Sequence, residues 1–130
     1  MQDVRSKART SLQEFVSAWL GGNYEAVAEA CSPTVRWWTP LSDKTATGPD
    51  EAFAALERVL APIPRPIEVS ALVVAEDGSR GVVEMRARTV SDAGTLTLVT
   101  SVIAFSAGTV AEGRTYVDLT AHGEGNGASS

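Results

Sequence analysis

Apolar residues recur with a helical period in the first half of the chain. Between residues 12 and 20 they lie mostly three or four positions apart, and the two glycines that follow are typical of a helix end. A shorter stripe of the same kind covers 24–31 and stops at a Ser-Pro pair. A third helix begins with a proline at position 49 and cannot continue through the three prolines of 62–66. The pattern therefore predicts three helices.

The second half of the chain alternates between apolar and polar residues, which is the period of a β-strand. Strands are predicted at 35–39, 67–75, 82–90, 96–105 and 110–119. The last four are joined by the turn segments EDGS, SDAG and SAGT, and SDAGT fits a three-residue hairpin loop with a glycine bulge. This order predicts an α+β fold. Three helices pack on a strongly curved antiparallel sheet, and the resulting cone-shaped barrel encloses a pocket.

Length and composition fit one domain, predicted at 1–120, followed by a flexible Gly- and Ser-rich tail at 121–130. Lys and Arg number 11 against 16 Asp and Glu, and the basic residues are scattered, so we expect no nucleic-acid partner. The chain shows neither an apolar leader nor a run of about 18 apolar residues, so we expect a cytoplasmic protein without membrane association.

Few residues suit metal or thiol chemistry. Cys31 is the one cysteine, and a lone thiol at the end of an apolar stripe is expected in the core. The single histidine, His122, lies in the predicted tail. Without a cluster of Cys and His ligands a transition-metal site is not expected, and no cofactor is implied.

The segment VRWWTP, residues 35–40, places two tryptophans side by side on one predicted strand. Successive side chains of a strand point to opposite faces, so one indole faces the cone interior and the other faces the outside. We favour Trp37 and Thr39 inward, with Trp38 outward beside Arg36. The opposite register stays open, so both tryptophans are candidates for a ligand wall.

The element order resembles the nuclear transport factor two-like superfamily, as do FVSAWLGGNYEAVAEACSPTVRWWTP near the front and GTVAEGRTYVDL near the back. Within it the chain is most similar to the branch of ketosteroid isomerases and SnoaL-like polyketide cyclases, over roughly residues 8–119. The resemblance implies the cone fold. It does not select one reaction, because the superfamily contains isomerases, cyclases, dehydratases, epoxide hydrolases and proteins without catalysis.

The steroid isomerases of this branch imply a first set of catalytic positions. They use a tyrosine on the first helix and a protonated aspartate as an oxyanion hole, and a second aspartate moves the proton. These positions fall at Phe15, Ser101 and Thr39. A phenyl ring donates no hydrogen bond, and a neutral hydroxyl is no base at pH 7. Ser101 and Thr39 are therefore candidate catalytic hydroxyls, but steroid isomerisation by that mechanism is not expected.

The epoxide hydrolases of the same fold imply a second set, an Asp-Arg-Asp combination. In EMRARTV, Arg86 matches the arginine, whereas Arg88 and Thr115 stand where the two aspartates would be. A bulged SDAGT hairpin would pair Met85 with Ser101 and turn Arg86 outward, towards solvent or a second subunit. A regular turn would instead bring Arg86 inward as a clamp for an anion or carbonyl, so it remains a candidate catalytic residue.

The expected ligand wall is aromatic and apolar, with a few hydroxyls. It comprises Phe15, Trp19, Trp37, Trp38, Phe53, Met85, Val99, Thr115 and Val117. Such a wall suits a hydrophobic, oxygen-bearing small molecule such as a polyketide, a terpenoid or a steroid-like compound. By holding its substrate folded near attack geometry, it can promote cyclisation or isomerisation in a biosynthetic pathway without a cofactor.

Two classes of function remain open from the sequence. One is a cofactor-independent enzyme, either a cyclase or isomerase or, alternatively, an epoxide-opening hydrolase. The other is a non-catalytic module for small-molecule binding or dimerisation. An ionisable group with a perturbed pKa inside the cone would favour the enzyme, and a filled or wholly apolar cone would favour the module. A homodimer through the outer sheet face is expected, because Trp38, Leu98, Val102 and Tyr116 would otherwise form an exposed apolar patch.

Overall fold

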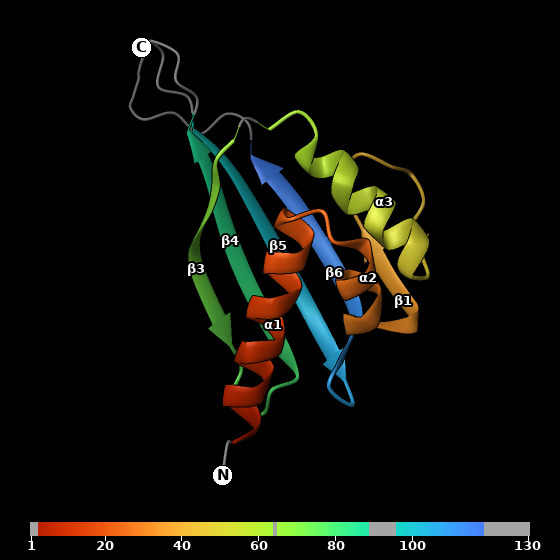
Figure 1. The fold of residues 1–130 in the computed structure, drawn as a ribbon, viewed down its shortest axis with the longest axis vertical. Coiled ribbons are helices and arrows are strands. Elements are labelled where there is room, and N and C mark those ends of the chain that lie inside the picture. The colour runs from red at the N-terminus through yellow and green to blue at the C-terminus, as the bar shows by residue number, and fades with distance from the viewer. Residues whose placement is uncertain (1–2, 64, 89–95, 119–130) are drawn as a thin grey trace.

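The computed structural model describes residues 3–63, 65–88 and 96–118, and its fold is drawn in Figure 1. Three helices lie against one side of a six-stranded curved sheet, so the expected α+β cone is confirmed. In chain order the elements are α1 (Val4–Leu20), α2 (Tyr24–Ala30), β1 (Cys31–Trp38), β2 (Ala46–Thr47), α3 (Pro49–Leu60), β3 (Ile67–Val74), β4 (Arg80–Arg88), β5 (Leu96–Ser106) and β6 (Thr109–Asp118).

Polar caps and a proline define where the helices start. Asp3 precedes α1, and its carboxylate accepts a hydrogen bond of 2.7 Å from the Ser6 amide. Asn23 caps α2 in the same way, through a 3.1 Å bond from the Ala26 amide. These caps satisfy backbone N–H groups that have no partner inside the helix. α3 begins at Pro49, as predicted, with two carboxylates in its first turn that favour the positive end of the helix dipole.

The strand order in the sheet is β2-β1-β6-β5-β4-β3. Every neighbouring pair is antiparallel except β1 and β6, which run parallel, so the expectation of a wholly antiparallel sheet is wrong for this ladder. The reason is the long connection between them: α3 and four strands intervene, which gives the chain room to return in the same direction. The short strand β2 lies in the segment between β1 and α3, where the sequence pattern predicts no strand.

The register between β4 and β5 differs from the expected one by two residues. Met85 pairs with Val99, and Ser101 pairs with Val83 instead of Met85. The last described pair of this ladder joins Arg88 to Leu96. The predicted SDAG turn itself lies outside the described residues. A shift of two residues preserves the face of every side chain, so the assignment of inner and outer positions stands.

The start of β1 is irregular. Its register with β6 shifts between Cys31 and Arg36, and Pro33 stands in this interval. Proline donates no ladder hydrogen bond, so within sheets it is confined to edges and bulges. Cys31 is the first residue of β1 rather than the end of the preceding helix, and it is buried, as expected for a core thiol.

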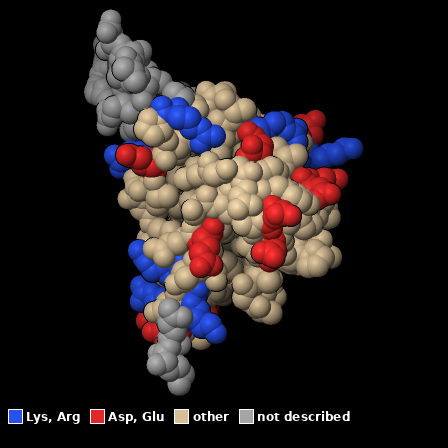
Figure 2. All heavy atoms as spheres, viewed as in Figure 1, with Lys and Arg blue, Asp and Glu red and all other residues tan. Residues whose placement is uncertain are grey.

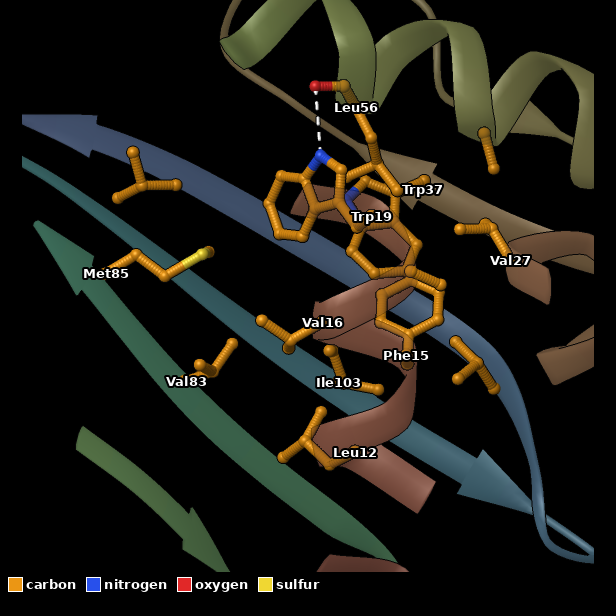
Figure 3. Close-up of a cluster of buried hydrophobic side chains, with 14 of the residues drawn as sticks. Leu12, Phe15, Val16, Trp19, Val27, Trp37, Leu56, Val83, Met85 and Ile103 are labelled. Carbon is orange, nitrogen blue, oxygen red and sulfur yellow. Dashed lines mark hydrogen bonds between the residues drawn. The ribbon is translucent and has the colours of Figure 1, made fainter. Parts of the chain in front are cut away.

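The core lies between the helices and the inner face of the sheet (Figure 3). α1 contributes Leu12, Phe15, Val16 and Trp19, each no more than 2% exposed, and α3 adds Leu56. The inner side chains of β1, β4, β5 and β6 form the opposite wall. Burying one large apolar side chain is worth about 1.5–3 kcal/mol, so this layer is the main stabilising contact of the fold.

Candidate functional site

Trp37 occupies the centre of the inner face and is held on both sides of its ring. Its indole stacks on Phe15 with ring centroids 5.5 Å apart and an interplanar angle of 19°. The other side of the ring rests on Gly113 of β6, where an added Cβ would lie 2.5 Å from the indole carbons. No Cβ fits at that distance, so glycine is required opposite Trp37. The expectation that Trp37 faces inward is confirmed.

A chain of hydrogen bonds runs from this indole across the inner face. Trp37 Nε1 donates to Thr115 Oγ1 at 2.8 Å, and Thr115 Oγ1 lies 2.8 Å from Ser101 Oγ. The indole N–H can only donate, whereas either hydroxyl can donate in the second bond. All three side chains are at most 1% exposed, so this relay satisfies polar groups that would otherwise be unpaired in an apolar core.

Much of the expected ligand wall is packed against itself. Seven inner residues are each no more than 1% exposed: Phe15, Trp19, Trp37, Met85, Val99, Ser101 and Thr115. Trp19 Nε1 also donates to the backbone oxygen of Leu56 at 3.3 Å, which ties α1 to α3 (Figure 3). A water-sized void beside these side chains would expose part of their surface. The central part of the interior is therefore filled by side chains, and a ligand cannot reach it without rearrangement.

Two candidates from the sequence lie on the outer face of the sheet. Trp38 contacts the ring of Tyr116 at 5.3 Å and the guanidinium of Arg114 at 5.8 Å. Arg86 is exposed and pairs with Leu98. Each directly follows an inward residue, so strand alternation turns it away from the interior. Neither Trp38 as a wall residue nor Arg86 as a clamp can touch a ligand held inside the cone, and the inward alternative for Arg86 is wrong.

Phe53 packs at the edge of the core rather than in its centre. It is half-buried on α3 and makes an edge-to-face contact with Tyr24 of α2, with ring centroids 5.3 Å apart. The Tyr24 hydroxyl donates to the carboxylate of Asp50, and this bond raises the pKa of the phenol. Tyr24 is 41% exposed. Phe53 therefore joins the edge of the core to a contact between two helices.

The upper end of the cone, where β4 and β6 end and β5 begins in Figure 1, is lined differently. There Thr97 pairs with Ala87, which pairs with Ile67. Thr39 points inward, as expected; it is 3% exposed and its hydroxyl accepts a 3.3 Å hydrogen bond from a backbone amide. Val117 is half-buried on the same face. Sequence reasoning missed Thr97, although alternation along β5 places it on the inner face.

The described interior offers neutral hydrogen-bonding groups. Its buried polar side chains are Thr39, Thr97, Ser101 and Thr115, all hydroxyls. Burial raises the pKa of the Cys31 thiol to about 11, so it is protonated at neutral pH and is a poor nucleophile.

Within the described ranges no group of three His, Cys, Asp or Glu residues could hold a metal ion. No helix in that part of the chain is long and apolar enough to cross a membrane.

A separate groove of about 590 Å³ lies between α1 and β3. Val16, Leu20 and Leu72 give it apolar walls, and Arg9 donates across it to the backbone oxygen of Leu72 at 3.0 Å. Figure 2 shows the helix-covered side of the molecule, where basic side chains gather at the N-terminal end of α1 and acidic ones spread over the helices. The groove opens on this side and is distinct from the row of inner hydroxyls.

The family follows from the match to known sequences. The family model of the SnoaL-like domain matches residues 12–116, and the chain belongs to this family. A search of curated proteins gave no match.

Solved structures support the same fold. A candidate SnoaL-like polyketide cyclase from Jannaschia sp. CCS1 is 19% identical, with a TM-score of 0.73 over 92% of this chain and 90% of that one. A steroid delta-isomerase from Pseudomonas aeruginosa is 18% identical, with a TM-score of 0.69 over 87% and 80%. A de novo designed protein with a curved β-sheet is 21% identical, with a TM-score of 0.70 over 91% and 88%. At such identities the likeness shows the fold alone.

Proposed function

We propose that this chain binds a hydrophobic, oxygen-bearing small molecule of the polyketide, terpenoid or steroid-like class at the upper end of its cone. It promotes cyclisation or isomerisation of that molecule by holding it folded. The observation that carries the proposal is the chemistry of the described interior, an apolar face whose buried polar side chains are all hydroxyls. Neutral hydroxyls suit carbonyl, ether and hydroxyl oxygens on an otherwise apolar ligand.

The upper end is the favoured place because Ala87 and Thr97 are small and the Thr97 hydroxyl has no hydrogen-bond partner among the described residues. Thr97 is 5% exposed, and its side chain makes no hydrogen bond to another described residue. Its register partner Ala87 contributes only a methyl group. A buried hydroxyl without a partner is uncommon, and a ligand oxygen would supply one. The central rows below are filled, which is why we place the ligand at this end of the interior.

The chemistry available to such a site is orientation and neutral hydrogen bonding. Orientation alone can contribute on the order of 7–11 kcal/mol to a cyclisation. Acid–base chemistry has no agent among the buried described residues, since Cys31 is their one ionisable side chain and its pKa is raised. The epoxide-opening alternative needs an inward arginine, and Arg86 points outward. Two solved structures with a similar fold are named as a SnoaL-like polyketide cyclase and a steroid delta-isomerase, and these names support the substrate class.

A second candidate is a non-catalytic module that binds the same class of molecule. The filled central rows and the lack of an ionisable buried group other than Cys31 in the described interior favour it. Binding alone does not separate the two candidates. Incubation with ligands that bind, followed by product analysis, does: turnover identifies the enzyme, and binding without any product identifies the module.

The binding test uses a panel of polyketones, terpenoids and steroids, measured by calorimetry and tryptophan fluorescence. Thr97→Val keeps the shape of the side chain and removes its hydroxyl. It should weaken binding about two- to tenfold, the range of one neutral hydrogen bond. Thr100→Val, on the outer face of the same strand, is the matched control and should bind normally. The proposal fails if no member of the panel binds, or if Thr100→Val weakens binding as much as Thr97→Val.

A further inference from the structure

The inner face of the sheet is left partly uncovered at its β3 edge, beside α1. β3 is the last strand of the sheet, and α1 lies next to it and runs in the opposite direction (Figure 1). Val69 belongs to the inner face, since it pairs with Met85, yet it is 45% exposed whereas Met85 is fully buried. Inward apolar surface that solvent reaches is surface that a ligand can bury. Val69 forms one wall of the groove between α1 and β3.

One stripe of α1 forms the other side of this groove. Arg9, Gln13, Val16 and Leu20 follow one another at helical spacing, and together they cover about 16 Å of the helix. The stripe changes in character along its length, because Arg9 and Gln13 are polar and exposed whereas Leu20 is apolar and half-buried. Val16 lies between them and is 2% exposed, so it forms the floor. A volume of about 590 Å³ is within the range of small-molecule sites.

Arg9 supplies a fixed positive charge at the polar end of the groove. Its Nη1 donates to the backbone oxygen of Leu72 at 3.0 Å, which holds the guanidinium against β3. A guanidinium has more N–H donors than this bond uses, and two of them can bind a carboxylate side by side. Among the described residues Arg9 has no carboxylate partner. The carboxylate of Glu84, on the neighbouring strand, accepts from Ser70 Oγ at 2.8 Å instead.

We propose that this groove is a second ligand site, which takes a monomeric carboxylic acid with an unbranched apolar chain of medium length. The carboxylate binds Arg9, and the chain lies over Val16 towards Leu20 and Val69. Arg9 is the one charged residue in the described lining, so charge complementarity selects an acid over an amine of the same length. The groove shares no residue with the upper end of the cone, where Thr97 lies.

The backbone edge of β3 disfavours an added peptide strand as the occupant. An open edge strand can pair with another chain through its free N–H and C=O groups. Here Arg9 already binds the Leu72 oxygen, and the register of β3 with β4 shifts between Val69 and Ala71. Both features interrupt a continuous row of backbone partners. Recognition in this groove therefore rests on its side chains.

Ligands that differ in one group test the charged end. Decanoate, decanol and decylamine share one chain and differ only in the head group. Nuclear magnetic resonance titration below micelle-forming concentrations gives each dissociation constant. Decanoate should bind about tenfold more tightly than decanol, which is the low end for a hydrogen bond to a charged group because Arg9 is exposed. Decylamine should bind most weakly, and the shifted amides should lie in α1 and β3.

Variants of the two ends should respond differently. Arg9→Gln should make decanoate bind no better than decanol, whereas Arg9→Lys should keep part of the preference. Arg58→Gln, on the exposed side of α3, makes the same change in charge and should keep all of it. Val69→Ala removes apolar surface and should weaken acid and alcohol alike, by about three- to tenfold. Each variant is compared through the ratio of two ligands, so a partly unfolded fraction does not alter the result.

Thr97→Val separates this site from the one proposed at the upper end of the cone, and it should leave decanoate binding unchanged. A loss of decanoate binding in Thr97→Val, or amide shifts confined to the upper end, would place the acid inside the cone and overturn the inference. Equal binding of decanol and decanoate by the parent chain, or no binding of either, would overturn it too. So would an effect of Arg58→Gln as large as that of Arg9→Gln.

Discussion

The two faces of the sheet differ in burial and in chemistry. Along β5, Ser101 and Ile103 face inward and are fully buried, whereas Thr100 and Val102 face outward and are partly exposed. The described inner face bears hydroxyls and apolar groups, and the outer face bears the acidic and basic side chains of β4 and β6. The difference separates two chemical environments: neutral hydroxyls and apolar groups on one side of a strand, and charged groups on the other.

The adjacent tryptophans show how the same residue type behaves on each face. Trp37 has a stacked ring, a glycine beneath it and a hydrogen bond, so it is held in a single position. Trp38 lies among Arg114 and Tyr116 and keeps part of its surface exposed. An indole on the inner face is part of the core, and its neighbour on the outer face stays in contact with solvent.

The largest expected effect comes from truncating each indole in turn. Trp37→Ala should lower the free energy of unfolding by about 3–5 kcal/mol, because it leaves a cavity under Phe15 and removes the donor to Thr115. Trp38→Ala should cost about 1 kcal/mol or less in the monomer. Urea unfolding at low protein concentration measures both. Equal losses would show that the two faces do not differ in packing as described.

A smaller effect is expected from two glycines of one inner row, Gly113 and Gly81, which flank Ile103 on β5. Gly113→Ala places a Cβ against the held ring of Trp37 and should cost about 1–3 kcal/mol. In Gly81→Ala the near atom, at 2.7 Å, is the terminal Cδ2 of Leu12, which can rotate away, so the loss should be smaller. Chemical denaturation of the pair gives the ranking. The reverse order would mean that Trp37 moves more freely than its contacts indicate.

The smallest expected effect concerns the buried hydrogen bonds that link Trp37, Thr115 and Ser101. Ser101→Ala removes one hydroxyl from a buried pair with Thr115 and should cost about 0.5–1.5 kcal/mol. Thr100→Val makes a comparable change on the outer face and should alter the free energy of unfolding by about 0.5 kcal/mol or less. Thermal unfolding at matched protein concentration compares them. No loss in Ser101→Ala would show that the relay contributes nothing to stability.

Much of the fold was predictable because its signals are local. Proline at position 49, the capping residues and the two periods of hydrophobicity bound the helices and most of the strands. Alternation placed Trp37 and Trp38 on opposite faces of the sheet, and Met85 and Arg86 likewise, and a register error of two residues did not disturb this division. It left open which of the two faces is the inner one. The parallel pairing of β1 with β6 was not predictable in this way, because it joins segments with no turn between them.

The sequence by itself determined which side chains share a face, since the two-residue period is a property of neighbouring residues. Only the tertiary structure decided what each face contains. Trp37 reaches Thr115 across 78 positions of the chain, and Gly113 makes room for the indole from the parallel neighbouring strand. Whether a cone is hollow or filled depends on how the volumes of distant side chains add together. Long-range packing brings these side chains together, so no local sequence pattern predicts whether the interior is filled.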